Sequence, residues 1–462
     1  MLDTTSLVKT DLSSQKTAGD DSADLDPLDK KEPSTESLGE RLLCIMEKFS
    51  ATRERSLELI ADLGAEDCNL QSMPDVSPLK WHLAHTTWFF ETFIYHNPTF
   101  IFSKEEGQHR PAVSPEEYKY LFNSYYNAIG KQYPRAQRSL ISRPVLTDII
   151  DYRTRVNHAL GLIADEAFAA VRCQRVERGA DTHKKVVKLI ERIELGIHHE
   201  MQHQELMLMD IKHALSKNPL YPALPRLNDL DSYNHSAQVK EKVIFQSTDT
   251  QIGHRKREQF CFDNELPPHK VHIPSFALQS RLVSNREFIE FIEAGGYENP
   301  ALWLSDGWAW VQKNNIECPE YWCTDNGSKN FEVYNFKGRT KLKLDDPLSH
   351  ISYFEAQAYA SFQGARLPTE QEWEYAIGAR PESFKDAYYL WQWTNSAYLA
   401  YPGFKPFEEE AGEYNGKFMC GQFVLRGGSF ATPPSHTRAS YRNFFYPHQR
   451  WIYSGIRLAF DV

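Results

Sequence analysis

Residues 183–215 read HKKVVKLIERIELGIHHEMQHQELMLMDIKHAL, and this stretch decides the fold of the first half of the chain. Its apolar residues recur every three or four positions, which predicts one long amphipathic helix. On such a helix His199 and His203 lie one turn apart on the same face, about 6 Å from each other. Two histidines at this spacing can bind one metal ion together.

Three further stretches have the same periodicity, so the sequence predicts a four-helix bundle. They are ERLLCIMEKFSATRERSLELIADL (40–63), LKWHLAHTTWFFETFIYH (79–96) and VLTDIIDYRTRVNHALGLIADEAF (145–168). Ser77 and Pro78 precede the second helix in the order typical of a helix start. A connection of residues 97–144 separates the second and third helices, and loops of that length are usually functional.

The whole chain is predicted to be an α+β protein of two domains, because 462 residues are too many for one core. Residues 1–38 lack aromatic side chains and are expected to form a disordered tail. Residues 39–216 form the bundle, 217–239 a polar linker, and 240–462 a second domain of short segments broken by Gly and Pro. In that second domain we expect two short helices, at NREFIEFIEAGG (285–296) and YFEAQAYASFQG (353–364).

Composition and charge favour a globular protein that handles small molecules. Hydrophobic residues make up 41% of the chain, and the net charge of -10 disfavours nucleic-acid binding. The sequence has no secretory signal and no membrane-spanning stretch, so a cytoplasmic location is expected. Its seven cysteines are irregularly spaced, which argues against a disulfide framework. Cys318 and Cys323 have no second pair to complete a zinc site.

The second helix offers a third histidine for a metal site. His82 and His85 both lie in WHLAH (81–85), and either can reach across the core of a bundle. Three neutral imidazoles suit a metal that binds substrate and dioxygen, although imidazole alone does not separate iron from zinc. The alternative is a set of core or solvated histidines without a ligand. Their clustering argues against it, because buried paired imidazoles would be poorly satisfied.

The stretch from His199 to His203 also fits the H-E-x-x-H pattern of zinc peptidases, in which Glu200 would be the general base. Such peptidases usually take their third ligand from a downstream residue, whereas the candidates here lie upstream. The peptidase hypothesis predicts hydrolysis that depends on zinc and on Glu200 but not on dioxygen.

Several motifs together resemble the iron(II)-dependent sulfoxide synthases of ergothioneine and ovothiol biosynthesis, also called the hercynine oxygenase family. In the bundle they are SPLKWHLAHTTWFFE (77–91) and HEMQHQE (199–205). In the second half they are FDNELPPH (262–269), SNREFIEFIEAGGY (284–297), RLPTEQEWEYA (366–376), LRGGSF (425–430), YRNFFYP (441–447) and SGIRLAF (454–460). The resemblance covers nearly everything after residue 38.

The resemblance implies a DinB-like four-helix bundle followed by a formylglycine-generating-enzyme-like domain of C-type-lectin-like architecture. It implies iron(II) bound by His85, His199 and His203, and so selects His85 over His82. It does not imply the copper chemistry of the formylglycine-generating enzyme. That enzyme has a cysteine where this chain has Leu458, and no cysteine follows Cys420.

The resemblance also implies roles for residues that would surround the metal. Tyr125 and Tyr126 resemble a tyrosine pair that donates a proton or electron, and the order of the two stays open. A further set resembles the substrate contacts of the family. Arg135 and Arg138 would bind the carboxylate of the thiol substrate, and the residues near hercynine would be Gln202, Asn443, Phe444 and Phe445. The alternative for the arginines is a pair of surface charges, and for the tyrosines a pair of aromatic anchors.

Family members couple a thiol to an imidazole ring carbon with dioxygen. Phe445 and Gln449 replace an acidic residue and an arginine of the branch that uses γ-glutamylcysteine, which favours free cysteine, although Arg450 lies close enough to compensate. The expected product is hercynylcysteine sulfoxide. An ovothiol-type activity on histidine is the nearest alternative, and its enzymes commonly have a further methyltransferase domain. A non-catalytic lectin-like binding module is a third hypothesis. No nucleic-acid or membrane partner is expected, and the oligomeric state stays open.

Overall fold

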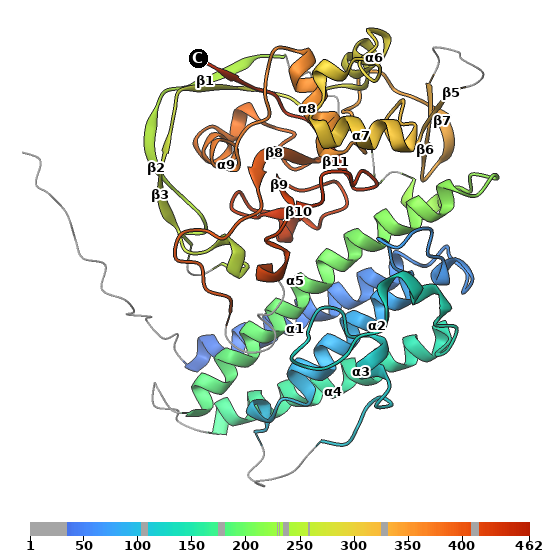
Figure 1. Ribbon diagram of the computed structural model, residues 1–462. Helices are drawn as coiled ribbons and strands as arrows, with labels where there is room; N and C mark the ends of the chain where they lie inside the picture. The colour runs from blue at the N-terminus through green and yellow to red at the C-terminus, as the bar shows by residue number, and fades with distance from the viewer. Residues whose placement is uncertain are drawn as a thin grey trace, which may run out of the picture.

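The computed structural model describes residues 35–102, 110–173, 181–228, 230, 232–233, 240–256, 259–324, 331–407 and 415–462. It consists of a helical bundle and a second body of short strands and helices, and the long helix α5 lies between the two (Figure 1). The predicted disorder of the tail falls outside these residues up to position 34. Helix α1 begins at Thr35, slightly before the predicted end of that tail.

Four long helices form the bundle, as the sequence predicted. They are α1 (Thr35–Glu58), α2 (Leu79–Phe90), α4 (Leu146–Cys173) and α5 (Asp181–Ser216). A π-helical turn, Glu91–Tyr95, prolongs α2. Within the connection that follows lie the helix α3 (Tyr118–Leu121), which is one turn long, and the 3-10 helix Arg135–Leu140. Helix α2 is buried along its whole length, because α4 and α5 pack against it and the connection covers it.

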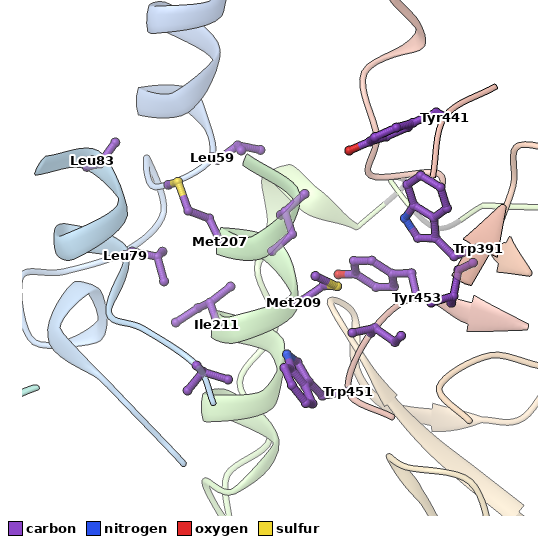
Figure 2. Packing of buried hydrophobic residues seen from close by; sticks show 14 of the residues in the cluster. Leu59, Leu79, Leu83, Met207, Met209, Ile211, Trp391, Tyr441, Trp451 and Tyr453 are labelled. Carbon is purple, nitrogen blue, oxygen red and sulfur yellow. The ribbon is translucent and has the colours of Figure 1, made fainter. Parts of the chain in front are cut away.

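Helix α5 is covered on two sides, which explains why it has so many buried residues. Figure 2 shows that Met207 and Ile211 extend toward the bundle, where Leu83 of α2 lies, whereas Met209 extends toward Tyr453 of the second domain. All five side chains are at most 2% exposed. Burial of such side chains stabilises a protein by about 1.5–3 kcal/mol each. One helix therefore belongs to both cores, and the two domains meet along it.

In the second domain, the residues that the structure describes form four small sheets. Their strands are β1 (Lys242–Phe245), β2 (Thr248–Ile252), β3 (His269–Ile273), β4 (Phe276–Gln279), β5 (Trp322–Thr324), β6 (Phe331–Asn335), β7 (Gly338–Lys341), β8 (Trp391–Ala397), β9 (Phe423–Arg426), β10 (Asn443–Phe445), β11 (Ser454–Gly455) and β12 (Ala459–Asp461). The strand orders are β1-β4-β12, β10-β9-β8-β11, β2-β3 and β5-β6-β7. All pairs are antiparallel except β8 with β11. In Figure 1, β10 is on the side of this domain that faces α5.

Among these strands the described residues form four α-helices, whereas the sequence led us to expect two. The expected ones are α6 (Asn285–Glu293) and α8 (Tyr353–Phe362); α7 (Ser305–Asn314) and α9 (Glu370–Ala379) were missed. Helix α9 begins with a capping box, in which the Thr369 hydroxyl accepts from the backbone N–H of Glu372 and the Glu372 carboxylate accepts from that of Thr369. The T-x-x-E pattern is a signal for a helix start, and its use would have found α9.

The sequence predicted no membrane-spanning stretch and no disulfide framework. None of the described helices combines the length and apolar character needed to cross a bilayer. The cytoplasmic location stays a prediction. The six cysteines whose side chains the structure describes are free thiols, and the Sγ atoms of Cys318 and Cys323 contact backbone carbonyl oxygens of Trp322 and Glu332.

Close packing between α2 and α5 predicts a clear effect of Gly196→Ala. A Cβ atom at Gly196 would lie 2.7 Å from Cζ of Phe90 and nearer still to Cε1, one helical turn before His199. We expect the variant to lose about 1–3 kcal/mol of unfolding free energy, because the two helices would have to move apart. Chemical denaturation measures this loss.

The matched control is Gly161→Ala on α4, where a Cβ atom would have no neighbour within 4 Å. This variant should be up to about 1 kcal/mol more stable than the wild type, because alanine favours helix. Equal stability of the Gly196→Ala variant and the wild type would contradict the close contact.

Candidate metal centre and adjoining cavity

Three histidines converge where α2 and α5 cross. His85 comes from α2, and His199 and His203 from successive turns of α5; one ring nitrogen of each lies within 4.8 Å of the others. The Nε2 atoms of His85 and His199 are 3.2 Å apart. All three side chains are buried. The structure thus brings together the three residues that were expected as ligands.

These histidines are neutral, which is the state that a metal ligand requires. Burial lowers the pKa of His199 to about 4, and it holds the pKa values of His85 and His203 well below the usual value. Three neutral imidazoles that face one another, with no carboxylate in the group, fit a transition-metal ion with open coordination positions.

Hydrogen bonds of the Nδ1 atoms fix the orientation of the His85 and His203 rings. Nδ1 of His85 donates to the carbonyl oxygen of Phe122 at 2.6 Å, which leaves Nε2 with its lone pair. Nδ1 of His203 lies 2.8 Å from Nδ1 of His82, whose Nε2 lies 3.0 Å from Oδ2 of Asp210. Because the Asp210 carboxylate only accepts, His82 donates to it from Nε2 and accepts from His203. His82 therefore supports His203, as is usual for groups behind a metal ligand.

Glu200 is turned away from the three histidines and into the bundle. Its carboxylate accepts from Nη1 of Arg53 at 2.8 Å, from the Ser56 hydroxyl at 2.5 Å and from Nη2 of Arg153. Burial alone would raise the pKa of Glu200, but Arg153 and Arg53 lower it to about 2. The carboxylate is therefore an ionised partner of two arginines. Its position contradicts the role of general base that a zinc peptidase would need.

A cavity of about 290 Å³ lies between the bundle and the second domain and reaches His203. Seven of the residues expected around the metal line it. They are Tyr125, Arg135, Arg138, Gln202, Asn443, Phe444 and Phe445. Strand β10 contributes Asn443, Phe444 and Phe445, and α5 contributes Gln202 and His203. The cavity therefore has one wall from each domain.

The two predicted tyrosines occupy different surroundings. Tyr125 lines the cavity, and its Oη accepts from Nη1 of Arg135 at 2.8 Å. Its backbone carbonyl accepts from Lys417, which ties this loop to the second domain. Tyr126 is 3% exposed, is not among the residues that line the cavity, and packs in the bundle core with its ring 4.9 Å from that of Phe93. Of the pair, Tyr125 is the one that lines the cavity.

The two predicted arginines lie on the bundle side of the cavity. Besides its bond to Tyr125, the exposed Arg135 donates to the backbone carbonyl of Asp75. Arg138 is 3% exposed, donates to the Ser77 hydroxyl at 2.8 Å and lies 3.3 Å above the ring of Trp81. Burial and the charge of Arg135 lower the pKa of Arg138 to about 9, so it is still a cation at neutral pH. No carboxylate of the described residues pairs with either arginine within 4 Å, which leaves both cations for an anionic ligand.

Trp81 connects this arginine to the metal centre. Its ring stacks on that of His85, with the centroids 4.7 Å apart and the planes 9° from parallel. The same ring contacts Arg138. Trp81 lies within the WHLAH motif, but the sequence analysis did not assign it a role, because an aromatic residue in a bundle helix is usually interpreted as an ordinary core residue.

Arg450 is separate from the cavity, so its suggested part in substrate binding is not supported. Its guanidinium pairs with Glu320 at 2.9 Å and with Glu355 at 3.2 Å, and it donates to the carbonyl of Cys318. Gln449, one residue earlier, does line the cavity. Arg450 is thus committed to the fold of the second domain.

Glu205 joins the two walls, and sequence reasoning missed it. Its buried carboxylate accepts from Nε1 of Trp391 at 2.6 Å and from the hydroxyls of Ser429 and Thr432 at 2.7 and 2.6 Å. Burial raises its pKa, although these three donors act in the opposite direction. Glu205 is two residues after His203, so these bonds hold the turn of α5 that contains His203 against the second domain.

Known families match both halves of the chain. The DinB superfamily model matches residues 48–207, and the sulfatase-modifying factor enzyme 1-like domain matches residues 230–392 and 387–462. A hercynine oxygenase of Mycolicibacterium smegmatis is 30% identical over 90% of this chain and 99% of its own. The hercynine oxygenase of Mycobacterium tuberculosis is 28% identical over 92% and 99%. The ergothioneine biosynthesis protein 1 of Schizosaccharomyces pombe is 28% identical over 46% of this chain and 29% of its own.

Fold, histidine site and relatives together define a two-domain, metal-dependent oxygenase. The chain belongs to the hercynine oxygenase family. This confirms the resemblance read from the motifs, the α+β fold with its DinB-like and formylglycine-generating-enzyme-like domains, and the expected class of enzyme, an oxidoreductase.

The geometry of the histidines predicts how metal binding responds to substitution. His85→Ala should abolish stoichiometric metal binding, because it removes one of three ligands. His82→Ala should weaken metal affinity about 10–100-fold, because His203 loses the group that orients it. Metal content after anaerobic reconstitution with iron(II) and desalting measures both effects. His272→Ala, at an exposed histidine of β3, is the control and should keep its metal. Full metal content in the His85→Ala variant would contradict the assignment.

Proposed function

We propose that the protein is a non-haem iron(II) sulfoxide synthase that couples cysteine to the imidazole C2 of hercynine with dioxygen. The observation that carries this proposal is the cavity beside His203, which is lined by Arg135 and Arg138, neither of them paired with a carboxylate of the described residues, and also by two amides and two aromatic rings, those of Gln202, Asn443, Phe444 and Phe445. Hercynine and cysteine have the complementary groups: an imidazole with a trimethylammonium group, and a small thiol with a carboxylate.

In the proposed reaction, the C2–H bond of hercynine and the S–H bond of cysteine break and a C–S bond forms. Dioxygen takes up four electrons; one oxygen atom ends on sulfur as the sulfoxide and the other leaves as water with the two hydrogens. His85, His199 and His203 would hold the iron. When bound, the metal supplies the activation of dioxygen and the positioning of sulfur beside carbon.

Free cysteine is the thiol that the cavity favours. Arg138 and Arg135 can bind one carboxylate, and a guanidinium offers two parallel donors for it. A γ-glutamyl arm would need a second set of polar partners. Phe445 and Gln449 occupy the positions where the γ-glutamylcysteine branch has such partners, and Arg450, one residue further on, is paired with Glu320 and Glu355. These contacts support cysteine over the longer thiol.

Hercynine would bind against the wall built by α5 and β10. Gln202 and Asn443 offer polar atoms there, and Phe444 and Phe445 offer ring surface. The ring of Phe444 stacks on that of Tyr398, with their centroids 4.1 Å apart. Aromatic faces attract a trimethylammonium group, which is a cation without hydrogen-bond donors. Histidine, the substrate of the ovothiol alternative, has a primary ammonium group and gains less from such a wall.

Tyr125 is the group that we propose as proton donor. Its Oη lies in the cavity and accepts a hydrogen bond from Arg135. The positive charge of Arg135 stabilises the phenolate that forms when this hydroxyl gives up its proton. Tyr126 has no comparable position, because it does not line the cavity.

Turnover with defined substrates tests the proposed function. Protein reconstituted anaerobically with iron(II) should, on admission of dioxygen, convert cysteine and hercynine to the sulfoxide, identified by mass spectrometry. Histidine in place of hercynine, and γ-glutamylcysteine in place of cysteine, should react more slowly. The His85→Ala protein should give no product. Faster turnover of histidine would overturn the choice of hercynine and favour the ovothiol-type reaction.

Separate replacement of the two tyrosines tests the proton donor. Tyr125→Phe should slow sulfoxide formation about 10²–10⁴-fold, the usual contribution of a general acid. Tyr126→Phe is the matched control and should react nearly at the wild-type rate, because its ring stays in the bundle core. Single-turnover rates measure both variants. A slow Tyr126→Phe protein would transfer the role to Tyr126, and two fast variants would remove it from both residues.

A further inference from the structure

A chain of hydrogen bonds leaves α5 at Gln202, passes through two residues of the second domain and returns to α5 at His198, one turn earlier. Nε2 of Gln202 donates to Oη of Tyr441 at 2.8 Å, and that Oη lies 3.1 Å from Nε2 of His436. Nδ1 of His436 lies 2.7 Å from Nδ1 of His198. Because His198 and Gln202 are four residues apart on one helix, both ends of the chain have a fixed separation.

The middle of this chain is held rigidly. Tyr441 and His436 are 3% and 1% exposed. The guanidinium carbon of Arg438 lies 4.8 Å from the centroid of the Tyr441 ring, and the ring of Trp391 meets it edge-on at 5.3 Å. At the other end, His198 stacks on Phe260 with the centroids 3.8 Å apart. The phenol oxygen of Tyr441 therefore has one position relative to α5.

The donors and acceptors of the chain decide which atom of Gln202 faces the cavity. A neutral imidazole has one N–H, so His436 can accept from Tyr441 and donate to His198, or it can donate to Tyr441 and accept from His198. In the first case the Tyr441 hydroxyl gives its one hydrogen to His436, so Oη can only accept from Gln202, and this is the bond that the structure contains, from Nε2 of Gln202 to Oη of Tyr441. The amide oxygen of Gln202 then points the other way, and none of the described residues donates a hydrogen bond to it. Gln202 is half-buried and lines the cavity, so a ligand can reach that oxygen.

We propose that Tyr441 and His436 are positioning residues that hold Gln202 with its amide oxygen, and not its amide nitrogen, toward the substrate. The substrate would then be recognised at this point as a hydrogen-bond donor or as a cation, which suits the imidazole N–H or the polarised methyl groups of hercynine. This inference rests on the proposed function. It assigns a positioning role to two residues of the second domain that take no part in the reaction itself.

The first test is Tyr441→Phe, which removes the hydroxyl and keeps the ring. The amide of Gln202 can then turn either way, and a net hydrogen bond of about 1 kcal/mol corresponds to about a fivefold change in affinity. We expect the dissociation constant of hercynine, measured by anaerobic calorimetry on the iron-loaded protein, to rise about 3–10-fold. Metal content and the KM for cysteine should not change.

A double-mutant cycle separates positioning from a general structural effect. In a Gln202→Ala background, Tyr441→Phe should leave hercynine affinity unchanged, because the group on which it acts is absent. His436→Gln changes the chain at the residue beyond Tyr441 and should give a smaller rise in the dissociation constant of hercynine. This rise should also be lost in the Gln202→Ala background. Tyr321→Phe is the control, since Tyr321 is buried and its hydroxyl has no hydrogen-bond partner among the described residues.

The outcomes are distinguishable. Tyr441→Phe with wild-type affinity for hercynine would overturn the positioning role and leave the proposed function intact. Effects of Tyr441→Phe and Gln202→Ala that multiply in the double variant would also overturn it, because the two residues would then act independently. Failure of the wild-type protein to bind hercynine would overturn the proposed function itself, together with this inference.

Discussion

The burial of α5 on two sides is the constraint on which the rest of the structure depends. One helix of 36 residues gives two histidines of the candidate metal site to the bundle, a carboxylate to the interface and an amide to the cavity. These groups lie on different sides of α5, so a rotation of the helix about its axis would displace all of them at once. The Glu200 pair with Arg53 and Arg153 fixes that rotation from the bundle, and the Glu205 bonds to Trp391, Ser429 and Thr432 fix it from the second domain.

Desolvation affects the protonation of the buried histidines and of the buried Arg138 in different ways. Burial lowers the pKa of the histidines and so keeps them neutral, as a metal ligand must be, whereas the buried Arg138 keeps its charge, because even a pKa of about 9 lies above neutral pH. A cation held away from water without an anionic neighbour is costly in a folded protein. It is the kind of group that a charged ligand satisfies. The site is thus polarised before anything binds, with the cation on one wall and acceptor atoms on the other.

Periodicity was sufficient to predict the bundle, and spacing was sufficient to predict the pair His199 and His203, because these two residues are neighbours on any helix. The spacing left His82 and His85 open as the third histidine, and the choice of His85 came from the family resemblance. Helices α7 and α9 were missed since their apolar residues pack in a small irregular core without long periodicity. The capping box at Thr369 was the available signal.

Long-range contacts were harder to predict. Nothing local distinguishes Tyr125 from Tyr126, yet one faces the cavity and the other packs in the core. The pairing of Arg450 with Glu320 and Glu355 joins positions 130 and 95 residues apart, and the chain from Gln202 to His436 joins α5 to a loop more than 230 residues later. Pattern analysis of single segments contains no information on such contacts.

The cavity is divided between the two domains, so the groups on its two sides can change separately. The bundle holds the candidate metal ligands together with Arg135, Arg138 and Gln202, while β10 and its neighbours supply the remaining surface against which hercynine would lie. Mutations in the second domain can therefore change which molecules are accepted without touching the groups that bind the metal. A family with this layout can broaden or shift its substrate range through one half of the chain, and the other half can stay under strict selection for reactivity.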